Sequence, residues 1–396
     1  MKSKSEQVSP KTVRVVLYVL TVLLAVGFLY AGNRLAAAGG GVLPPLTGAD
    51  FLPATVQTIT SREVSELPGL AEGQTVQQVT LRFIAKQKDG TTVAAQQVID
   101  GYSTVHLEEV RVGNRVLLYP NPDPATTATA PYVLDDYQRA DGTLAVCVVF
   151  CILLLIFGRM KGLHTLVSLL LTIGVVFLVF LPLVLGGYNI YLSAIAVCIY
   201  VIVSTLLLVN GANAKTLVAI VGCSAGVLFA GLLTVLLSNT LRLTGMASQE
   251  AIYLADLGTR NPVDLKAIVF AGILIGAVGA VMDVAMSLAS ALWELREGAA
   301  APTFGMLLKS GMNIGRDMMS TMANTLVLAY IGSSLSTVLL LVAYASSLDG
   351  LFNREMIITE VLQAVIGSMA ILLAIPLTSF VASAVYTRRK QPPKTI

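Results

Sequence analysis

The chain has 396 residues, of which 55% are hydrophobic and only 12% are charged, with a formal net charge of +3. Soluble domains average about 25% charged residues, so this composition is typical of a membrane protein. The small positive charge comes with no basic groove pattern, which argues against a nucleic-acid partner.

The residue types that usually carry chemistry are scarce. The two histidines, His106 and His164, lie in different regions, which disfavours Ser-His catalysis. No P-loop motif is present. We therefore expect no enzyme activity and no cofactor, and the sequence does not say whether a metal binds. All four cysteines lie in apolar runs, which disfavours disulfides and cysteine-based zinc sites: Cys147, Cys151, Cys198 and Cys223.

The chain begins with a polar, basic segment followed by an apolar run. We predict a cytoplasmic tail at residues 1–12 and a transmembrane anchor at 13–30. The Ala36-Ala37-Ala38 sequence is also compatible with a cleaved signal peptide, although the length of the run favours a retained anchor.

Residues 31–142 form the one sizeable polar segment, which we predict to be an extracytoplasmic β domain. Its Val-, Thr-, Ile- and Tyr-rich stretches are separated by Gly, Pro, Asp and Asn, and Asp89-Gly90 is a hairpin turn signal. The expected strands cover residues 55–60, 76–84, 91–99 and 110–119.

Seven further apolar stretches predict a membrane domain at residues 143–386, followed by a cytoplasmic tail at 387–396. The fold class is therefore a polytopic α-helical membrane protein with about eight transmembrane helices and a small extracytoplasmic β-rich domain after the first helix. The seven predicted helices cover residues 143–157, 163–185, 190–209, 216–238, 265–292, 322–344 and 361–386.

The distribution of Lys and Arg predicts the orientation. With the N-terminus in the cytoplasm, most basic residues of the tails and short loops fall on the cytoplasmic side, as the positive-inside rule requires. The loop at 239–264 is the exception. Both termini are thus predicted to be cytoplasmic, and residues 31–142 are predicted to lie outside.

One stretch, residues 271–294, carries polar and small residues at steps of three and four, the repeat of one helix face. Glycines on such a face allow another helix to approach closely, whether from this chain or from a second copy. A carboxylate at membrane depth costs roughly 2.5–3.5 kcal/mol and is usually functional. We therefore predict that this face points into the bundle, with its carboxylate in the cytoplasmic half of the membrane. The face consists of Gly272, Gly276, Gly279, Asp283, Ser287, Ser290 and Glu294.

A second polar stripe precedes the predicted helix at 322–344, where residues 303–316 fit an interfacial or re-entrant helix. If the two helices pack as antiparallel neighbours, the stripes converge into a candidate ion or substrate pathway. Their oxygens suit protons, Na⁺ or Mg²⁺ rather than soft metals. The alternative is that these groups only hold helices together by hydrogen bonds, that Arg316 pairs with Asp317, and that Glu294 is solvated. The second stripe comprises Ser310, Asn313, Asp317, Thr321 and Asn324, with Arg316 beside it.

Several stretches between residues 158 and 379 resemble the YibE/F family of bacterial multipass membrane proteins. They include GRMKGLHTLVSLLLT, GANAKT, AGILIGAVGAVMDVAMSLASALWEL, SGMNIGRDMMSTMANTLVLAY and IGSMAILLAIPLTS. The anchor and β segment are similar to the front half of the longer members. The resemblance implies this architecture and a bacterial plasma (inner) membrane. It assigns no role to any residue.

Two function classes follow from these patterns. The first is a membrane transporter or permease for a small solute or ion, coupled to protons or cations through Asp283 with help from Asp317. The alternative is a non-transporting membrane partner or regulatory subunit whose external β domain binds an envelope component. In both function classes we expect the lipid bilayer to be a partner. A homo-oligomer or an envelope protein is a further candidate partner.

Overall fold

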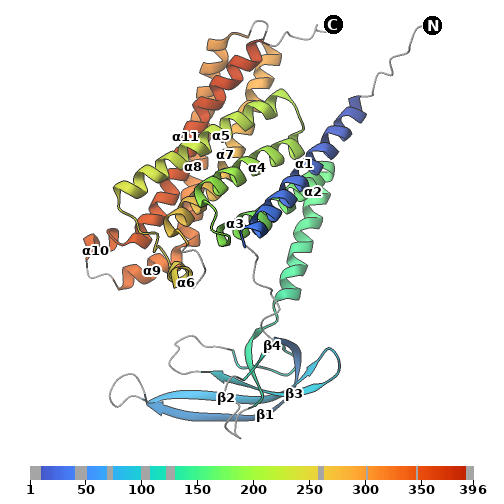
Figure 1. Cartoon of the computed structure of the whole chain (residues 1–396), viewed down its shortest axis with the longest axis vertical. Coiled ribbons are helices and arrows are strands. Elements are labelled where there is room, and N and C mark those ends of the chain that lie inside the picture. Colours follow the sequence, from blue (N-terminus) through green and yellow to red (C-terminus); the bar gives the residue numbers. More distant parts are fainter. Residues whose placement is uncertain are drawn as a thin grey trace, which may run out of the picture. The chain divides into compact units, whose positions relative to one another are not determined.

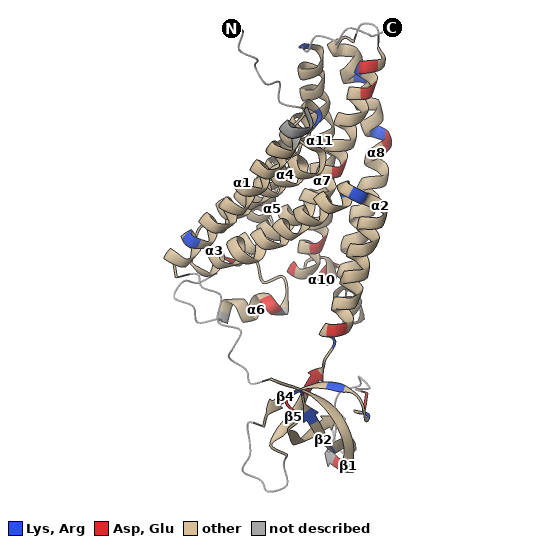
Figure 2. Cartoon of the chain, turned by 90° about the vertical axis from the view of Figure 1, so that its right-hand side faces the viewer, with Lys and Arg blue, Asp and Glu red and all other residues tan. Residues whose placement is uncertain are grey.

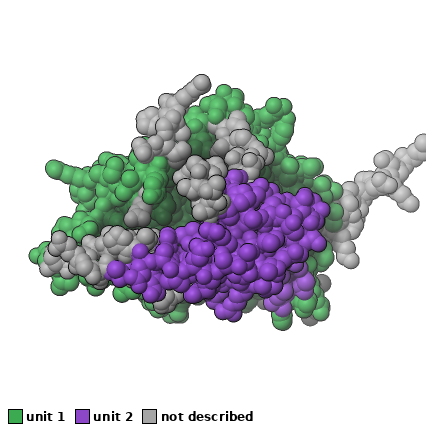
Figure 3. Space-filling view, turned by 90° about the horizontal axis from the view of Figure 1, so that it is seen from below, with its two compact units in different colours: residues 1–43, 154–396 green, residues 44–153 purple. Residues whose placement is uncertain are grey.

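The computed structural model describes residues 10–40, 51–68, 75–99, 108–121, 130–256, 263–299, 302–344 and 347–388. The predicted tails at 1–12 and 387–396 lie almost entirely outside these residues. The chain divides into two compact units, residues 44–153 and residues 1–43 together with 154–396 (Figure 3). Each unit is described by itself.

The smaller unit contains a closed five-stranded barrel with the order β1-β2-β3-β5-β4 (Figure 1). Neighbouring strands are antiparallel except β3 and β5, which are parallel. Closure leaves no free sheet edge, and five strands in a closed Greek-key arrangement are typical of OB-folds. The strands are β1 (Leu52–Pro68), β2 (Thr75–Gln87), β3 (Thr92–Ile99), β4 (Arg115–Pro120) and β5 (Tyr132–Tyr137).

The barrel has its own core, which includes Leu81, Phe83 and Val116. The predicted turn at Asp89-Gly90 is present, with the Thr91 amide donating to the Asp89 carboxylate at 3.0 Å. The fourth predicted strand is shorter than expected. Residues 111–114 turn instead, because Gly113 has a positive φ of 92° and the Arg111 amide donates to the Asn114 side chain.

The larger unit is helical, and charged residues are rare along its long helices (Figure 2). In the part of the chain that the structure describes, six helical stretches are long and apolar enough to cross a membrane, or up to seven if the bent pair α8–α9 is one span. The helices are α1 (Pro10–Ala38), α2 (Ala140–Val175), α3 (Leu181–Leu185), α4 (Ile190–Asn210), α5 (Ala214–Thr240), α6 (Gln249–Asp256), α7 (Leu265–Gly298), α8 (Phe304–Ser333), α9 (Leu335–Ala343), α10 (Leu348–Phe352) and α11 (Glu355–Arg388).

The count of eight predicted helices is not reproduced, because the predicted helices at 143–157 and 163–185 fall within one helical run. The run is interrupted at Arg159, whose φ of 48° and ψ of −126° are not helical. Gly162 then lies directly against the carbonyl group of Leu154. Residues eight apart are about 12 Å apart in a straight helix, so the backbone bends sharply at Arg159.

The predicted helix at 322–344 also differs from the structure. Thr303 caps a continuous helix from Phe304 to Ser333, its side chain accepting from the Met306 amide. The chain then bends by 62° into α9. Residues 303–316, predicted as a separate interfacial or re-entrant segment, are thus the first turns of one long helix.

The core of this unit forms where α11 packs against α5, α7 and α8. Glycines on the neighbouring helices allow this close approach: Thr378 lies against Gly222, Ser379 against Gly311, and Ile375 against Gly315. Any side chain at these glycines would displace an atom of α11. Small residues are the usual means of close helix approach in membranes.

We predict that Gly222→Val lowers the thermal unfolding midpoint of the protein in detergent, while Gly279→Val does not. A Cβ atom at Gly222 would lie 3.2 Å from the backbone Cα of Thr378, whereas nothing lies within 4 Å of one at Gly279. Overpacking of this kind costs about 1–3 kcal/mol. Fluorescence of the single tryptophan provides the readout. Equal midpoints for the two variants would contradict the packing described above.

Candidate functional site

The polar stripe of α7 lies on an open side of the helix. Gly272, Gly276, Gly279, Asp283 and Ser287 are all exposed, and Ser290 is half-buried. The opposite sides of α7 are buried, with Val281, Val284, Leu288 and Leu292 fully covered. This corrects the expectation for most of the stripe: α4, α5 and α11 pack on the apolar sides of α7. At Gly276, however, the Tyr330 side chain of α8 lies against the stripe.

Asp283 lies near the middle of α7. The helix has 34 residues, so it is about 51 Å long, and Asp283 lies about 27 Å from its start. α7 extends beyond residue 292, where the predicted helix ends. Within the described residues, no hydrogen bond or ion pair reaches the Asp283 carboxylate.

The second stripe lies along α8 and is also open. Asn313, Arg316, Asp317, Thr321 and Asn324 are exposed. The Thr321 hydroxyl donates to the carbonyl of Met318 on its own helix. Among the described residues, no ion pair joins Arg316 to Asp317. The structure therefore does not contain the ion pair between Arg316 and Asp317 that the alternative predicts.

Two contacts fix how α7 and α8 lie beside each other. Leu292 Cδ1 of α7 lies 3.0 Å from where a Cβ atom would stand on Gly311 of α8. The Tyr330 hydroxyl of α8 lies 2.5 Å from where a Cβ atom would stand on Gly276 of α7. The helices are thus antiparallel neighbours. Asp283 and Asp317 both lie between these contacts, so the two carboxylates occupy the same stretch of the helix pair.

A third group of polar residues, which the sequence did not single out, adjoins the first half of the α7 stripe. The buried phenol oxygen of Tyr330 has no hydrogen-bond partner in the described part of the chain. Glu360 is close enough to act on Tyr330 electrostatically, and the Gln363 amide nitrogen is 3.9 Å from a Cβ position on Gly272. Glu360 was missed because the predicted helix began at residue 361, whereas α11 begins at Glu355.

A cavity of about 300 Å³ lies between α2, α4 and α7 and reaches the stripe at Gly279. Its wall is mainly apolar but carries hydroxyl groups from Thr165, Ser168, Thr172 and Thr205. The Ser168 hydroxyl donates to Thr205 Oγ1 at 2.8 Å. The missing side chain of Gly279 leaves the cavity open toward the face that bears Asp283.

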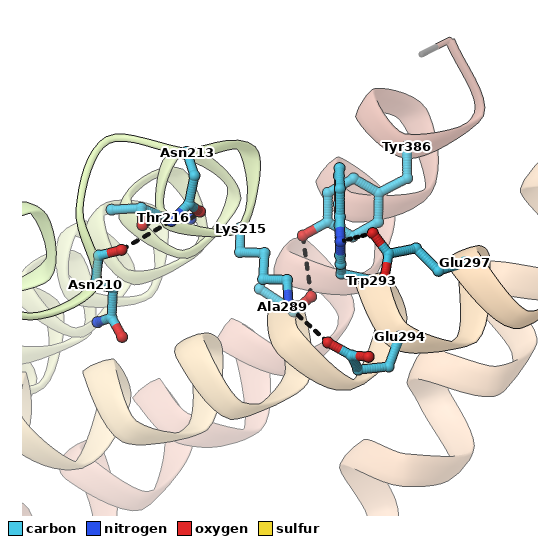
Figure 4. Close-up of polar contacts among 9 residues, drawn as sticks. All are labelled: Asn210, Asn213, Lys215, Thr216, Ala289, Trp293, Glu294, Glu297 and Tyr386. Carbon is cyan, nitrogen blue, oxygen red and sulfur yellow. Dashed lines mark hydrogen bonds and ion pairs between the residues drawn. The ribbon is translucent and has the colours of Figure 1, made fainter. Parts of the chain in front are cut away.

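Glu294, the last residue of the stripe, belongs to a set of contacts that ties the ends of α5, α7 and α11 together (Figure 4). Its carboxylate pairs with Lys215 of α5 at 2.7 Å. The buried Arg296 guanidinium lies 4.9 Å from the Trp293 ring and donates to the Tyr386 carbonyl of α11. The Tyr386 hydroxyl donates back to the Ala289 carbonyl. Glu294 thus has a structural partner that Asp283 and Asp317 lack.

We predict that Arg296→Met lowers the thermal midpoint and shifts the fluorescence of Trp293, whereas Lys215→Met changes the midpoint little. Arg296 is 2% exposed, and the substitution removes a buried hydrogen bond from a charged group to the Tyr386 carbonyl, at a cost of about 1.5–3 kcal/mol. The Glu294 side chain is 69% exposed, and such a pair contributes about 0–1 kcal/mol. A larger loss in Lys215→Met than in Arg296→Met would contradict this assignment.

Comparisons with known proteins identify the family of this chain. A family model described as YibE/F-like protein matches residues 146–388, more than half of the chain. Searches of curated proteins and of solved structures found no match. The matched residues contain both polar stripes, the cavity and the contacts around Trp293. The chain belongs to the YibE/F-like protein family.

Proposed function

We propose that the protein is a membrane transporter or permease, coupled to protons or cations, in which Asp283 is the group that binds the coupling ion. One observation carries the proposal: a carboxylate lies at the middle of a long apolar helix with no partner among the described residues. Such a group is costly in hydrocarbon unless a proton or cation neutralises it or water reaches it.

The surroundings of Asp283 support a path along α7. Gln363 and Tyr330 adjoin Gly272 and Gly276 in the first half of the stripe, and Glu360 lies near Tyr330. The open Gly279 follows, and then Asp283 and Ser287. Asp317 occupies the same stretch of α8, where Asn313, Thr321 and Asn324 supply further oxygens. Carboxylate, amide and hydroxyl oxygens suit protons or hard cations. The cavity that opens at Gly279 offers room for a small solute beside the coupling residue.

The break between α8 and α9 supports the proposal that part of this helix pair moves during transport. Discontinuous helices are how many transporters build their sites and change access to them. The 62° bend falls at Ser334, one turn after Tyr330. A change in the charge of the carboxylates would alter how α8 packs against α7, which couples ion binding to this bend.

The proposal includes eight membrane crossings, cytoplasmic termini, an outer β barrel and a bacterial plasma membrane. Counting the run that bends at Arg159 as two crossings and the α8–α9 pair as one supports the number eight. Contacts of α1 with the other helices support a retained anchor: Ala36 is fully buried, and the Tyr188 hydroxyl donates to the Leu35 carbonyl at 3.0 Å. The distribution of basic residues supports the orientation.

The test uses the purified full-length protein in liposomes that contain a pH-sensitive dye. Gradients of protons, Na⁺, K⁺, Mg²⁺ and Mn²⁺ are imposed in turn. We expect an ion-dependent signal that Asp283→Asn reduces to the level of empty liposomes, because the amide cannot take up a proton or balance a cation. Asp317→Asn should weaken the signal.

Glu294→Gln is the matched control, since it removes a carboxylate of the same helix that already pairs with Lys215. It should leave flux intact. A signal that Asp283→Asn does not change, or no signal from folded wild-type protein under any gradient, would rule the proposal out.

The β barrel supports the alternative proposal, in which the protein is a membrane partner or regulatory subunit. That unit has a closed sheet and its own core, as a module that binds an envelope component would need. Under this alternative, deleting residues 51–137 abolishes the cellular activity while Asp283→Asn leaves it unchanged. Under transport, the second change abolishes it.

A further inference from the structure

Two adjoining cavities follow the seam between α1 and α4, away from the α7 stripe. The larger, about 520 Å³, is almost entirely apolar. The smaller, about 270 Å³, lies toward one end of the same helices. Thr21 of α1 and Leu207 of α4 line both, so the two cavities form one continuous groove, here called the α1–α4 groove.

The apolar part of the groove has fixed walls. Phe28 of α1 stacks on Tyr200 of α4 with 4.7 Å between ring centroids. The Tyr200 hydroxyl also donates to the Ala25 carbonyl at 3.3 Å. The remaining lining side chains are mainly aliphatic, such as Leu24, Ile199 and Val203. This part of the groove suits a hydrocarbon chain.

The other end of the groove is still largely apolar, but it carries basic and polar groups. Lys161 and His164 line it together with Asn210 and the backbone around Gly211. The His164 ring stacks on Tyr18 with 4.4 Å between centroids, which holds the imidazole in place. No Asp or Glu is among the described residues that line either cavity. A cation without a nearby carboxylate selects an anionic group.

We propose that the α1–α4 groove binds an anionic glycerophospholipid, with its phosphate beside Lys161 and His164 and one acyl chain along Phe28 and Tyr200. The order of the lining matches such a molecule, charged at one end and apolar along the rest. Lys161 follows the bend at Arg159 and Gly211 follows the end of α4, and helix ends lie at headgroup level. Basic pockets between transmembrane helices are known sites for anionic headgroups. This proposal does not depend on transport.

The experiment measures which lipids stay bound to the full-length protein. Protein is equilibrated with mixed micelles of equal amounts of phosphatidylglycerol and phosphatidylcholine, and retained lipids are counted by native mass spectrometry. Wild type should retain phosphatidylglycerol preferentially. Lys161→Gln and His164→Gln together should reduce that preference by roughly fivefold or more, since one cation near a membrane surface contributes about that factor.

Two further variants complete the design. Ala196→Phe places a ring in the apolar part of the groove and should reduce retention of both lipids. Lys309→Gln removes an exposed cation of α8 and should leave the preference unchanged. Thermal midpoints show that each variant is folded.

Three results would overturn the proposal. The first is an unchanged preference in the double variant, and the second is unchanged retention in Ala196→Phe. The third is displacement of phosphatidylglycerol by soluble glycerol phosphate at equal concentration, which would mean that a free phosphate compound occupies the basic end and that the apolar part contributes nothing.

Discussion

The close packing of α11 against its neighbours is the contact on which the helical unit depends. Thr378, Ser379 and Ile375 lie directly against Gly222 of α5 and against Gly311 and Gly315 of α8, so these two helices are held at short distance from α11. In lipid, apolar side chains gain nothing from leaving the solvent, and close contact between small residues supplies the attraction instead. The same packing covers the apolar sides of α7. As a consequence, the polar stripe of α7 is the side that is left open.

An open stripe changes what Asp283 can do. A carboxylate inside a tightly packed bundle would need a permanent partner, and Asp283 is not in such a position. On the same helix, the exposed Glu294 pairs with Lys215 at 2.7 Å. Asp283 has an exposed position near the middle of a helix of 34 residues, with a cavity at Gly279 on one side and α8 on the other. That combination of position, access and missing partner is the basis on which we propose an ion-binding role for Asp283 rather than a structural one.

The two ends of the helical unit differ in how their helices are held together. At one end of α7, the contacts among Trp293, Arg296 and Tyr386 hold α7 against α11 through buried hydrogen bonds and a ring contact. Toward the other end, α8 breaks at Ser334, and the nearby Tyr330 phenol is buried without a hydrogen-bond partner in the described part of the chain. The proposed movement of α8 relies on this difference between the two ends of the helical unit. The groove between α1 and α4 lies apart from both, which is why we treat it as a separate lipid site.

The sequence by itself determined the membrane class, the β domain, the family and the two polar stripes, because long apolar runs and periods of three to four residues are local properties of the chain. It could not decide which side of a stripe faces a neighbour, since that depends on helices far away in sequence. Gly272, Gly276 and Gly279 were expected to pack. Tyr330 does lie against Gly276, but α11 packs on Gly222, Gly311 and Gly315. The sequence also could not predict where the helices end. α7, α8 and α11 extend past their apolar runs through charged turns that are held by caps and tertiary contacts. Only the tertiary structure brought Glu360 to Tyr330, placed Asp317 beside the stretch of α7 that holds Asp283, and aligned Lys161 with the apolar seam of α1 and α4.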